Sequence, residues 1–146
     1  MRVSTNTITT INRNGMRSTL LTLTELGMIL YWLVVSAGFL GLLHFNQVYM
    51  FTEYSNPVMV AWNWSFFPLD MLFAILGLYG RFGQISNSQT RFLSNVSLSL
   101  MFCAGLMALS FWAIQGDLDW AWWSVNVWLV CLSSFYLFRS YAYRAA

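Results

Sequence analysis

Asp70 lies near the middle of a long apolar stretch, where a carboxyl group finds few partners that could solvate it. At the centre of a lipid bilayer an ionised carboxylate costs about 2.5–3.5 kcal/mol on insertion scales, so a neighbouring group must compensate for it. Two interpretations follow. Asp70 can be a proton, cation or ligand site, or it can be a protonated or hydrogen-bonded acid that holds helices together.

Further residues could form a polar pocket with Asp70. Asn63 lies seven residues earlier, on the same helical face. Pro68 cannot donate a hydrogen bond to the carbonyl of Trp64, which predicts a kink and a free acceptor beside the acid. Asn126, in the last apolar stretch, lies at a similar depth and could hydrogen-bond to Asn63 across the bundle. The sequence therefore predicts a ligand or proton site formed by these residues together with Trp64, although the amides could instead serve only to hold helices together.

Glu25 is a second acid inside an apolar stretch, about 9 Å from its start at a helical rise of 1.5 Å per residue. Its long side chain could extend towards the membrane interface or towards Arg17. Glu25 could instead point inward and share a proton with Asp70, because two neighbouring carboxylates do not readily both ionise. In that case Glu25 also belongs to the candidate site.

The remaining residue types give little support for catalysis or metal binding. Cys103 and Cys131 are each fourteen residues from Asp117, which predicts equal depths in two antiparallel helices. Thiols without a basic neighbour stay protonated, so we expect two small apolar side chains rather than a disulfide. The single histidine, His44, is expected in solvent, and no nucleotide-binding or protease motif is present. We therefore expect no enzyme activity, no catalytic residues, no metal site and no cofactor.

Composition indicates that membrane-spanning helices position these residues. Of the 146 residues, 58% are hydrophobic and only 8% are charged, whereas soluble domains carry about 25% charged residues. A hydrocarbon core about 30 Å thick needs roughly 20 apolar residues per helix. Four stretches meet this requirement, at about 19–43, 58–80, 92–114 and 120–138. We predict an all-α, integral membrane four-helix bundle with antiparallel neighbouring spans, forming one domain over residues 19–146.

The arginines predict the orientation of the spans. All seven lie before the first span, between the second and third, or after the fourth, whereas the two opposite loops carry only acids. The positive-inside rule then places both termini in the cytoplasm. A basic stripe is missing, so no nucleic-acid partner is expected. Residues 1–18 are rich in Ser, Thr and Asn and are predicted to be a flexible cytoplasmic tail, in which Met16 is an alternative start to Met1.

A resemblance to a known family rests on two parts of the chain. Residues 56–70, with the sequence NPVMVAWNWSFFPLD, resemble the central motif of the YvaD-like family of small bacterial membrane proteins. Residues 102–106 and 110–114, with the aspartates before Trp122 and Trp123, are similar to its second half. The resemblance covers about half of the chain. It implies four spans and a bacterial cytoplasmic membrane, and it implies no activity.

Three hypotheses for function remain open. The first is a membrane protein that binds a small amphiphile or lipid in the polar pocket, or that serves as an accessory subunit. The second is a proton- or cation-coupled transporter that uses Glu25 and Asp70. The third is an immunity or assembly protein without a ligand. The expected partners are the lipid bilayer and either a small amphiphilic ligand or another membrane protein.

Overall fold

A computed structural model describes residues 5–43, 55–116 and 118–145. Within these ranges the chain forms five helices and no strand, in agreement with the predicted all-α class. The helices are α1 (Thr5–Phe39), α2 (Pro57–Ser65), α3 (Phe67–Phe82), α4 (Asn87–Gln115) and α5 (Trp120–Ala145). Because α2 and α3 are separated by one residue, they count as one candidate membrane span. The four stretches long and apolar enough to cross a membrane are Thr19–Phe39, Pro57–Phe82, Asn87–Gln115 and Trp120–Ala142.

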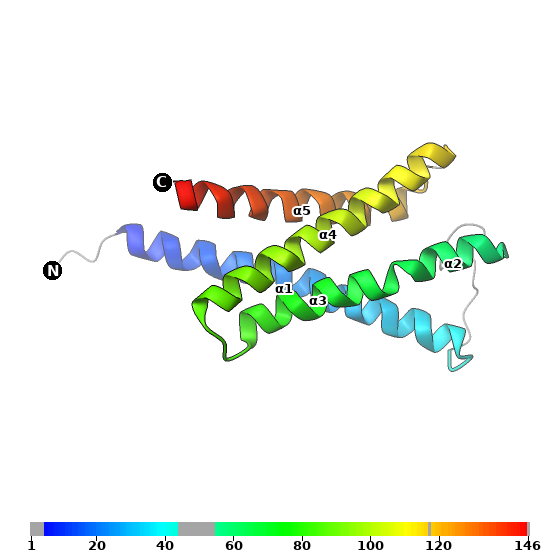
Figure 1. Cartoon of the computed structure of the whole chain (residues 1–146), viewed down its shortest axis with the longest axis horizontal. Coiled ribbons are helices and arrows are strands. Elements are labelled where there is room, and N and C mark those ends of the chain that lie inside the picture. The colour runs from blue at the N-terminus through cyan, green and yellow to red at the C-terminus, as the bar shows by residue number, and fades with distance from the viewer. Residues whose placement is uncertain (1–4, 44–54, 117, 146) are drawn as a thin grey trace.

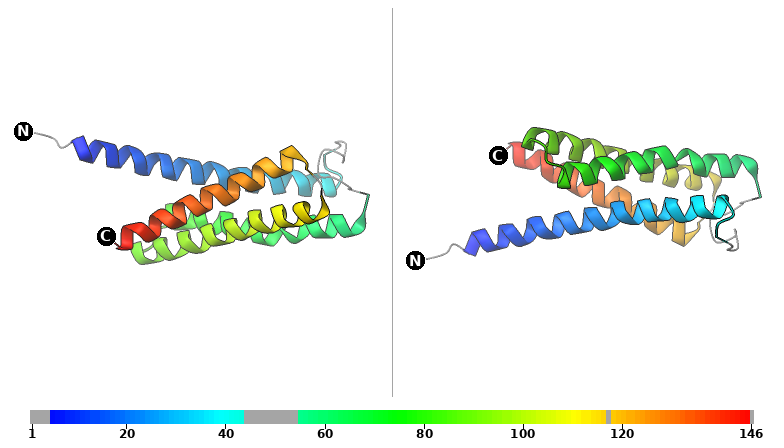
Figure 2. Two further views of the ribbon diagram at one scale, coloured as in Figure 1. Left: turned by 90° about the horizontal axis from the view of Figure 1, so that it is seen from above. Right: turned by 90° about the horizontal axis from the view of Figure 1, so that it is seen from below.

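The helices pack in chain order, α1 on α3, α3 on α4, and α4 on α5. The start of α1, the connection between α3 and α4 and the end of α5 all lie at one end of the molecule (Figure 1). Helix α5 crosses α1, and the first part of α1 diverges from the last part of α5 (Figure 2). Among the described residues, no Cα atom of α1 lies within 8 Å of a Cα atom of α4 or α5. Helix α1 is therefore attached to the bundle mainly through α3.

Helix α1 differs from its predicted limits at both ends. It begins at Thr5, although residues 1–18 are predicted to be a tail, and no proline in residues 5–18 stops the helix from continuing past the apolar stretch. It ends at Phe39 rather than at residue 43. Gly41 has a φ of 71°, and the N–H groups of Gly41 and Leu42 donate to the carbonyls of Gly38 and Ala37. This pair of bonds closes the last turn as a Schellman motif.

Helices α4 and α5 are longer than predicted. Helix α4 begins five residues earlier because Ser86 and Gln89 form a capping box, in which each side chain accepts a hydrogen bond from the other residue's backbone N–H. It ends at Gln115 and is followed by the C-cap residue Gly116, which has a φ of 73°. Helix α5 begins at Trp120, as predicted, with the Asp119 carboxylate accepting from the N–H of Ala121 at 2.9 Å, but it continues to Ala145.

The kink predicted from Pro68 appears as an interruption at Phe66, between α2 and α3. Pro68 has no N–H with which to bond the carbonyl of Trp64. The N–H of Phe66 donates to the carbonyl of Asn63 at 3.1 Å, and the N–H of Asp70 donates to the carbonyl of Phe66 at 2.8 Å. The break therefore lies between Asn63 and Asp70 and sets the direction of each half of the span.

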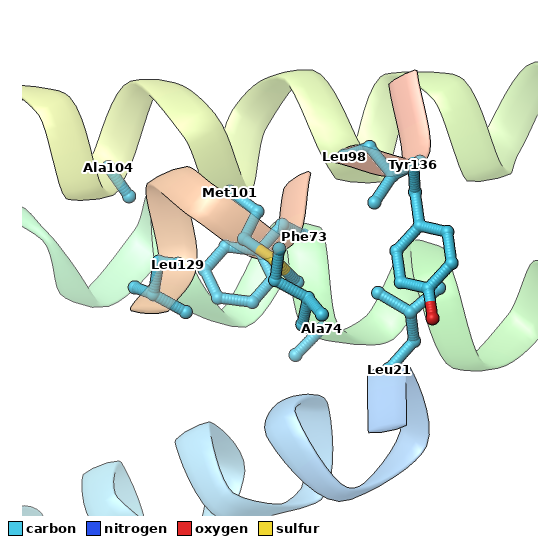
Figure 3. Packing of buried hydrophobic residues seen from close by; sticks show 9 residues of the cluster. Leu21, Phe73, Ala74, Leu98, Met101, Ala104, Leu129 and Tyr136 are labelled. Atoms are coloured by element: carbon cyan, nitrogen blue, oxygen red, sulfur yellow. The ribbon is translucent and has the colours of Figure 1, made fainter. Parts of the chain in front are cut away.

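The buried core lies between α1, α3, α4 and α5 (Figure 3). Its members are Leu21, Phe73, Ala74, Leu98, Met101, Ala104, Leu129, Leu132 and Tyr136. Many large apolar side chains point outward instead, including Leu30 (62% exposed), Phe138 (75%) and Ile114 (87%). Water disfavours such a surface, whereas lipid tails are as apolar as these side chains.

A buried ion pair joins α1 to α3. Glu25 is only 1% exposed, and its carboxylate pairs with the guanidinium of Arg81. Gly77 lies on the same side of α3, and a Cβ atom at this position would overlap the Glu25 carboxyl group and approach the Ser97 hydroxyl group. The hydroxyl group of Ser97 is itself engaged, since it donates to the carbonyl of Phe73 at 2.7 Å. Gly77 therefore permits a close approach of three helices.

We predict that Gly77→Ala lowers the free energy of unfolding by about 1–3 kcal/mol, because the added methyl group must displace Glu25 from Arg81 or Ser97 from Phe73. The measurement is unfolding of the detergent-solubilised protein by titration with dodecyl sulfate. Gly27→Ala is the matched control, because nothing lies within 4 Å of a Cβ atom there. Its stability should stay the same or rise by up to about 1 kcal/mol. Equal losses in both variants would contradict the close approach at Gly77.

Candidate functional site

A cavity of about 500 Å³ lies between the helices and is lined by residues of α1, α2, α3, α4 and α5. Most of its wall is apolar or aromatic, with Met28, Phe66, Trp122 and Leu129 among the lining residues. Its polar and acidic lining residues other than tryptophan are Thr24, Tyr31, Asn63, Asp70, Asp119 and Asn126. The structure therefore brings together three of the predicted site residues, Asp70, Asn63 and Asn126.

Asp70 is buried in the first turn of α3, with 6% of its surface exposed. Its Oδ2 atom accepts a hydrogen bond of 2.9 Å from Nε1 of Trp32 on α1. The Trp32 ring packs in turn against Trp64 in a tilted contact and against Phe67 in an edge contact, with ring centroids 5.5 and 5.2 Å away. The acid is thus held by a neutral indole donor, and its side chain lines the cavity.

Two polar atoms of the cavity wall are buried without satisfactory partners. Nδ2 of Asn63 and the hydroxyl oxygen of Tyr31 make no hydrogen bond of ordinary geometry among the described residues, although the Asn63 amide lies next to the Tyr31 hydroxyl. A buried polar group that lacks a partner costs about 1–3 kcal/mol. This side of the cavity can therefore donate hydrogen bonds to a ligand or to water.

Asn126 differs from its predicted role. Its Nδ2 atom donates to the carbonyl of Trp122 at 2.8 Å, one turn earlier in α5. The hydrogen bond expected between Asn126 and Asn63 is therefore wrong, because the asparagine on α5 is engaged by its own helix and Nδ2 of Asn63 has no partner. Asn126 still lines the cavity, with 6% of its surface exposed.

Glu25 and Trp64, the other predicted site residues, do not line the cavity. The alternative in which Glu25 shares a proton with Asp70 is wrong, because its carboxylate is buried and paired with Arg81. Trp64 supports the site indirectly, because its ring packs against Trp32 and the Trp32 indole donates a hydrogen bond to Asp70.

One wall of the cavity is formed by residues of α1 and α5 that are themselves exposed. Gly27 on α1, and Ala121, Val125 and Trp128 on α5, both line the cavity and reach the surface. A hydrogen bond spans this gap, from Nε1 of Trp128 to Oγ1 of Thr24 at 3.1 Å. The cavity therefore opens sideways, between the first and the last helix.

Sequence reasoning missed Thr24, Tyr31, Trp32 and Trp128. A signal for the first two was present, because Thr24 and Tyr31 lie seven residues apart and Gly27 and Met28 complete one helical face. Trp32 lies in an aromatic-rich sequence, and nothing in its type or spacing distinguishes it as the partner of Asp70. No group of three His, Cys, Asp or Glu residues in the described ranges could hold a metal ion.

The chain matches the model of a Family of unknown function (DUF5360) over residues 17–144. A relative from Bacillus subtilis (strain 168), described as "Uncharacterized protein YvaD", is 41% identical over 115 residues. The matched region covers 78% of this chain and 83% of the relative. No solved structure matches the chain.

We predict that Trp32→Phe lowers the free energy of unfolding by about 1–3 kcal/mol, because it leaves the buried Asp70 carboxyl group without its indole donor. Trp64→Phe is the matched control, since this indole makes only ring contacts among the described residues. Both variants are compared by the same dodecyl sulfate titration. If the two substitutions have equal effects, the hydrogen bond to Asp70 has no special contribution.

Proposed function

The chain belongs to the Family of unknown function (DUF5360), and its resemblance to YvaD-like proteins is confirmed. For this member of the family we propose that it binds a small amphiphile within the membrane. The observation that carries the proposal is the cavity, which combines the Asp70 carboxyl group with two unsatisfied polar atoms inside a bundle with an apolar exterior. Binding without catalysis accounts for this arrangement, and the proposal assigns the protein no enzyme activity.

The proposed location is the bacterial cytoplasmic membrane, with both termini in the cytoplasm. Arg81, Arg91 and Arg139 lie towards the end of the molecule where α1 begins and α5 ends (Figure 1). The positive-inside rule supports a cytoplasmic location for this end. Asp119 and Trp122 line the cavity near the opposite end. In this orientation most of the cavity lies in the outer half of the membrane, and its part at Thr24 and Gly27 extends into the inner half.

An amphiphile fits the cavity better than a wholly polar molecule does. The inner wall supplies polar partners, whereas the wall towards the gap is built from Gly27, Val125 and Trp128. A head group can bond to the buried polar atoms while an alkyl tail passes between α1 and α5 into the lipid. A wholly polar ligand would instead leave its own groups unpaired against apolar side chains.

The alternative of a transporter that uses two acids has less support. That hypothesis needs Glu25 and Asp70 to exchange a proton or an ion, whereas Glu25 is paired with Arg81 and does not line the cavity. Arg81 compensates the charge of Glu25 locally, so this acid has a structural explanation. The proposal therefore assigns binding to the cavity and helix attachment to Glu25.

The proposed orientation predicts the behaviour of reporter fusions in bacterial cells. Green fluorescent protein fused after the last residue should fluoresce, because it folds in the cytoplasm. Alkaline phosphatase should be active when fused after Gly116, between α4 and α5, and inactive when fused after Gly83, between α3 and α4. The opposite activities of the two phosphatase fusions would reverse the orientation.

We predict that Gly27→Trp weakens amphiphile binding at least about tenfold, because the indole fills the cavity beside the gap. The added Cβ meets no atom within 4 Å, so the fold should be retained. The measurement is native mass spectrometry with decylamine, decanol and decanoic acid, which share one tail length and differ in the head group. At least one should form a one-to-one adduct with the unmodified protein.

Leu26→Trp is the matched control, because Leu26 is the neighbouring residue, is 50% exposed and does not line the cavity. It should bind the same compound as the unmodified protein does. If none of the three compounds forms a one-to-one adduct, or if both tryptophan variants bind equally well, the proposed binding site is wrong.

A further inference from the structure

We propose that the ligand of this cavity is an organic cation, an amphiphile whose ammonium group binds at Asp70 and whose tail leaves between α1 and α5. The inference rests on the proposed function and adds to it the charge of the ligand. It follows from two independent features: the charges that line the cavity and the aromatic rings around it.

The cavity has acidic lining residues and no basic ones. Asp70 and Asp119 belong to its wall, whereas none of the lining residues is Lys, Arg or His. The nearest arginine along α3 is Arg81, eleven residues and about 16 Å beyond Asp70 at 1.5 Å per residue, and it is paired with Glu25. Among the described residues of the cavity wall, none carries a positive charge that could neutralise Asp70. A cationic ligand would supply it.

Aromatic rings favour an organic cation over an inorganic one. Tyr31, Phe66, Trp122 and Trp128 line the cavity together with the acids, and ammonium groups are attracted to the faces of such rings. A hard metal cation would instead need six or more oxygen ligands, roughly as Ca²⁺ does. The wall is mostly apolar, and its volume of about 500 Å³ is suited to a larger molecule.

Asn63 supplies the second polar contact. It is 6% exposed, and its Nδ2 atom is a buried donor that makes no hydrogen bond of ordinary geometry, although the Tyr31 hydroxyl lies next to it. Asp70 lies two helical turns away, about 10 Å along the helix, across the break at Phe66. A hydrogen-bond acceptor elsewhere in the ligand would accept from Asn63 while the ammonium group stays near Asp70.

The sideways opening provides the route for the tail. The Cα atoms of α1 and α5 stay more than 8 Å apart in the described residues. A hydrogen bond from Trp128 to Thr24 crosses between the two helices. An alkyl chain placed there would contact Gly27 and Val125. These residues are exposed, so the chain can continue into the lipid.

The test compares decyltrimethylammonium with decanol and decyl sulfate, which have the same tail. The full chain is placed in nanodiscs of uncharged phosphatidylcholine, and binding is measured by isothermal titration calorimetry after subtraction of the signal from empty nanodiscs. We expect the cation to bind at least about tenfold more tightly than decanol, and the anion to bind more weakly than decanol. If the cation shows no preference over decanol, the inference is overturned.

Asp70→Asn keeps the shape of the side chain and removes its charge. It should weaken binding of decyltrimethylammonium at least about tenfold and change the affinity for decanol by no more than about twofold. Equal losses for both compounds would assign Asp70 a structural role and overturn the inference. Asp119→Asn keeps a side-chain oxygen that can cap α5, and it should cause a smaller, cation-selective loss. If Asp70→Asn does not fold, two results decide whether the ligand is a cation: the preference of the unmodified protein for decyltrimethylammonium over decanol, and the effect of Asp119→Asn.

The results separate the two proposals. If decanol binds one-to-one and is excluded by Gly27→Trp, but the cation is not preferred, the binding site is retained and the charge assignment fails. If no compound binds one-to-one to the unmodified protein, both proposals fail.

Discussion

The arrangement of the helices depends on the groups that compensate two buried carboxyl groups. Glu25 and Asp70 are both almost fully buried in a bundle that exposes many large apolar side chains, so each carboxyl group depends on partners within the protein. Glu25 is compensated by a full opposite charge on Arg81, whereas Asp70 receives a neutral hydrogen bond from Trp32. Arg81 supplies Glu25 with a full counter-charge, whereas the Trp32 indole supplies Asp70 with a hydrogen bond and no charge. The two acids therefore have different consequences for the structure.

The Glu25–Arg81 pair and the Trp32–Asp70 bond both connect α1 to α3. Together with the absence of a side chain at Gly77, they hold α1 against one neighbour rather than at the centre of a closed bundle. Helix α5 packs on α4 and crosses α1 at a distance, and the space that remains between them becomes the open side of the cavity (Figure 2). The lateral opening between α1 and α5 thus follows from the two bonds that hold α1 against α3.

The sequence predicted the helical class, the four apolar stretches and three members of the cavity wall. Those successes depend on short-range patterns, since span length, proline chemistry and the face shared by Asn63 and Asp70 are all visible within one helix. The partners of Glu25 and Asp70 were not predictable, because Arg81 is 56 residues from Glu25 and Trp32 is 38 residues from Asp70. The helix limits were missed where local capping decides them, as at Ser86 and Gly41.

Asp70 could have served only as a link between helices, and the packing around it argues against that role alone. A structural acid is best satisfied when helices close around it and every nearby polar atom has a partner. Here Asp70 faces a cavity instead, beside the Asn63 amide and the Tyr31 hydroxyl, which lie next to each other without a hydrogen bond of ordinary geometry. Buried polar atoms without a well-formed hydrogen bond destabilise a folded protein. A ligand that bonds to them would recover that stability, and binding is therefore a better account of the arrangement than helix attachment is.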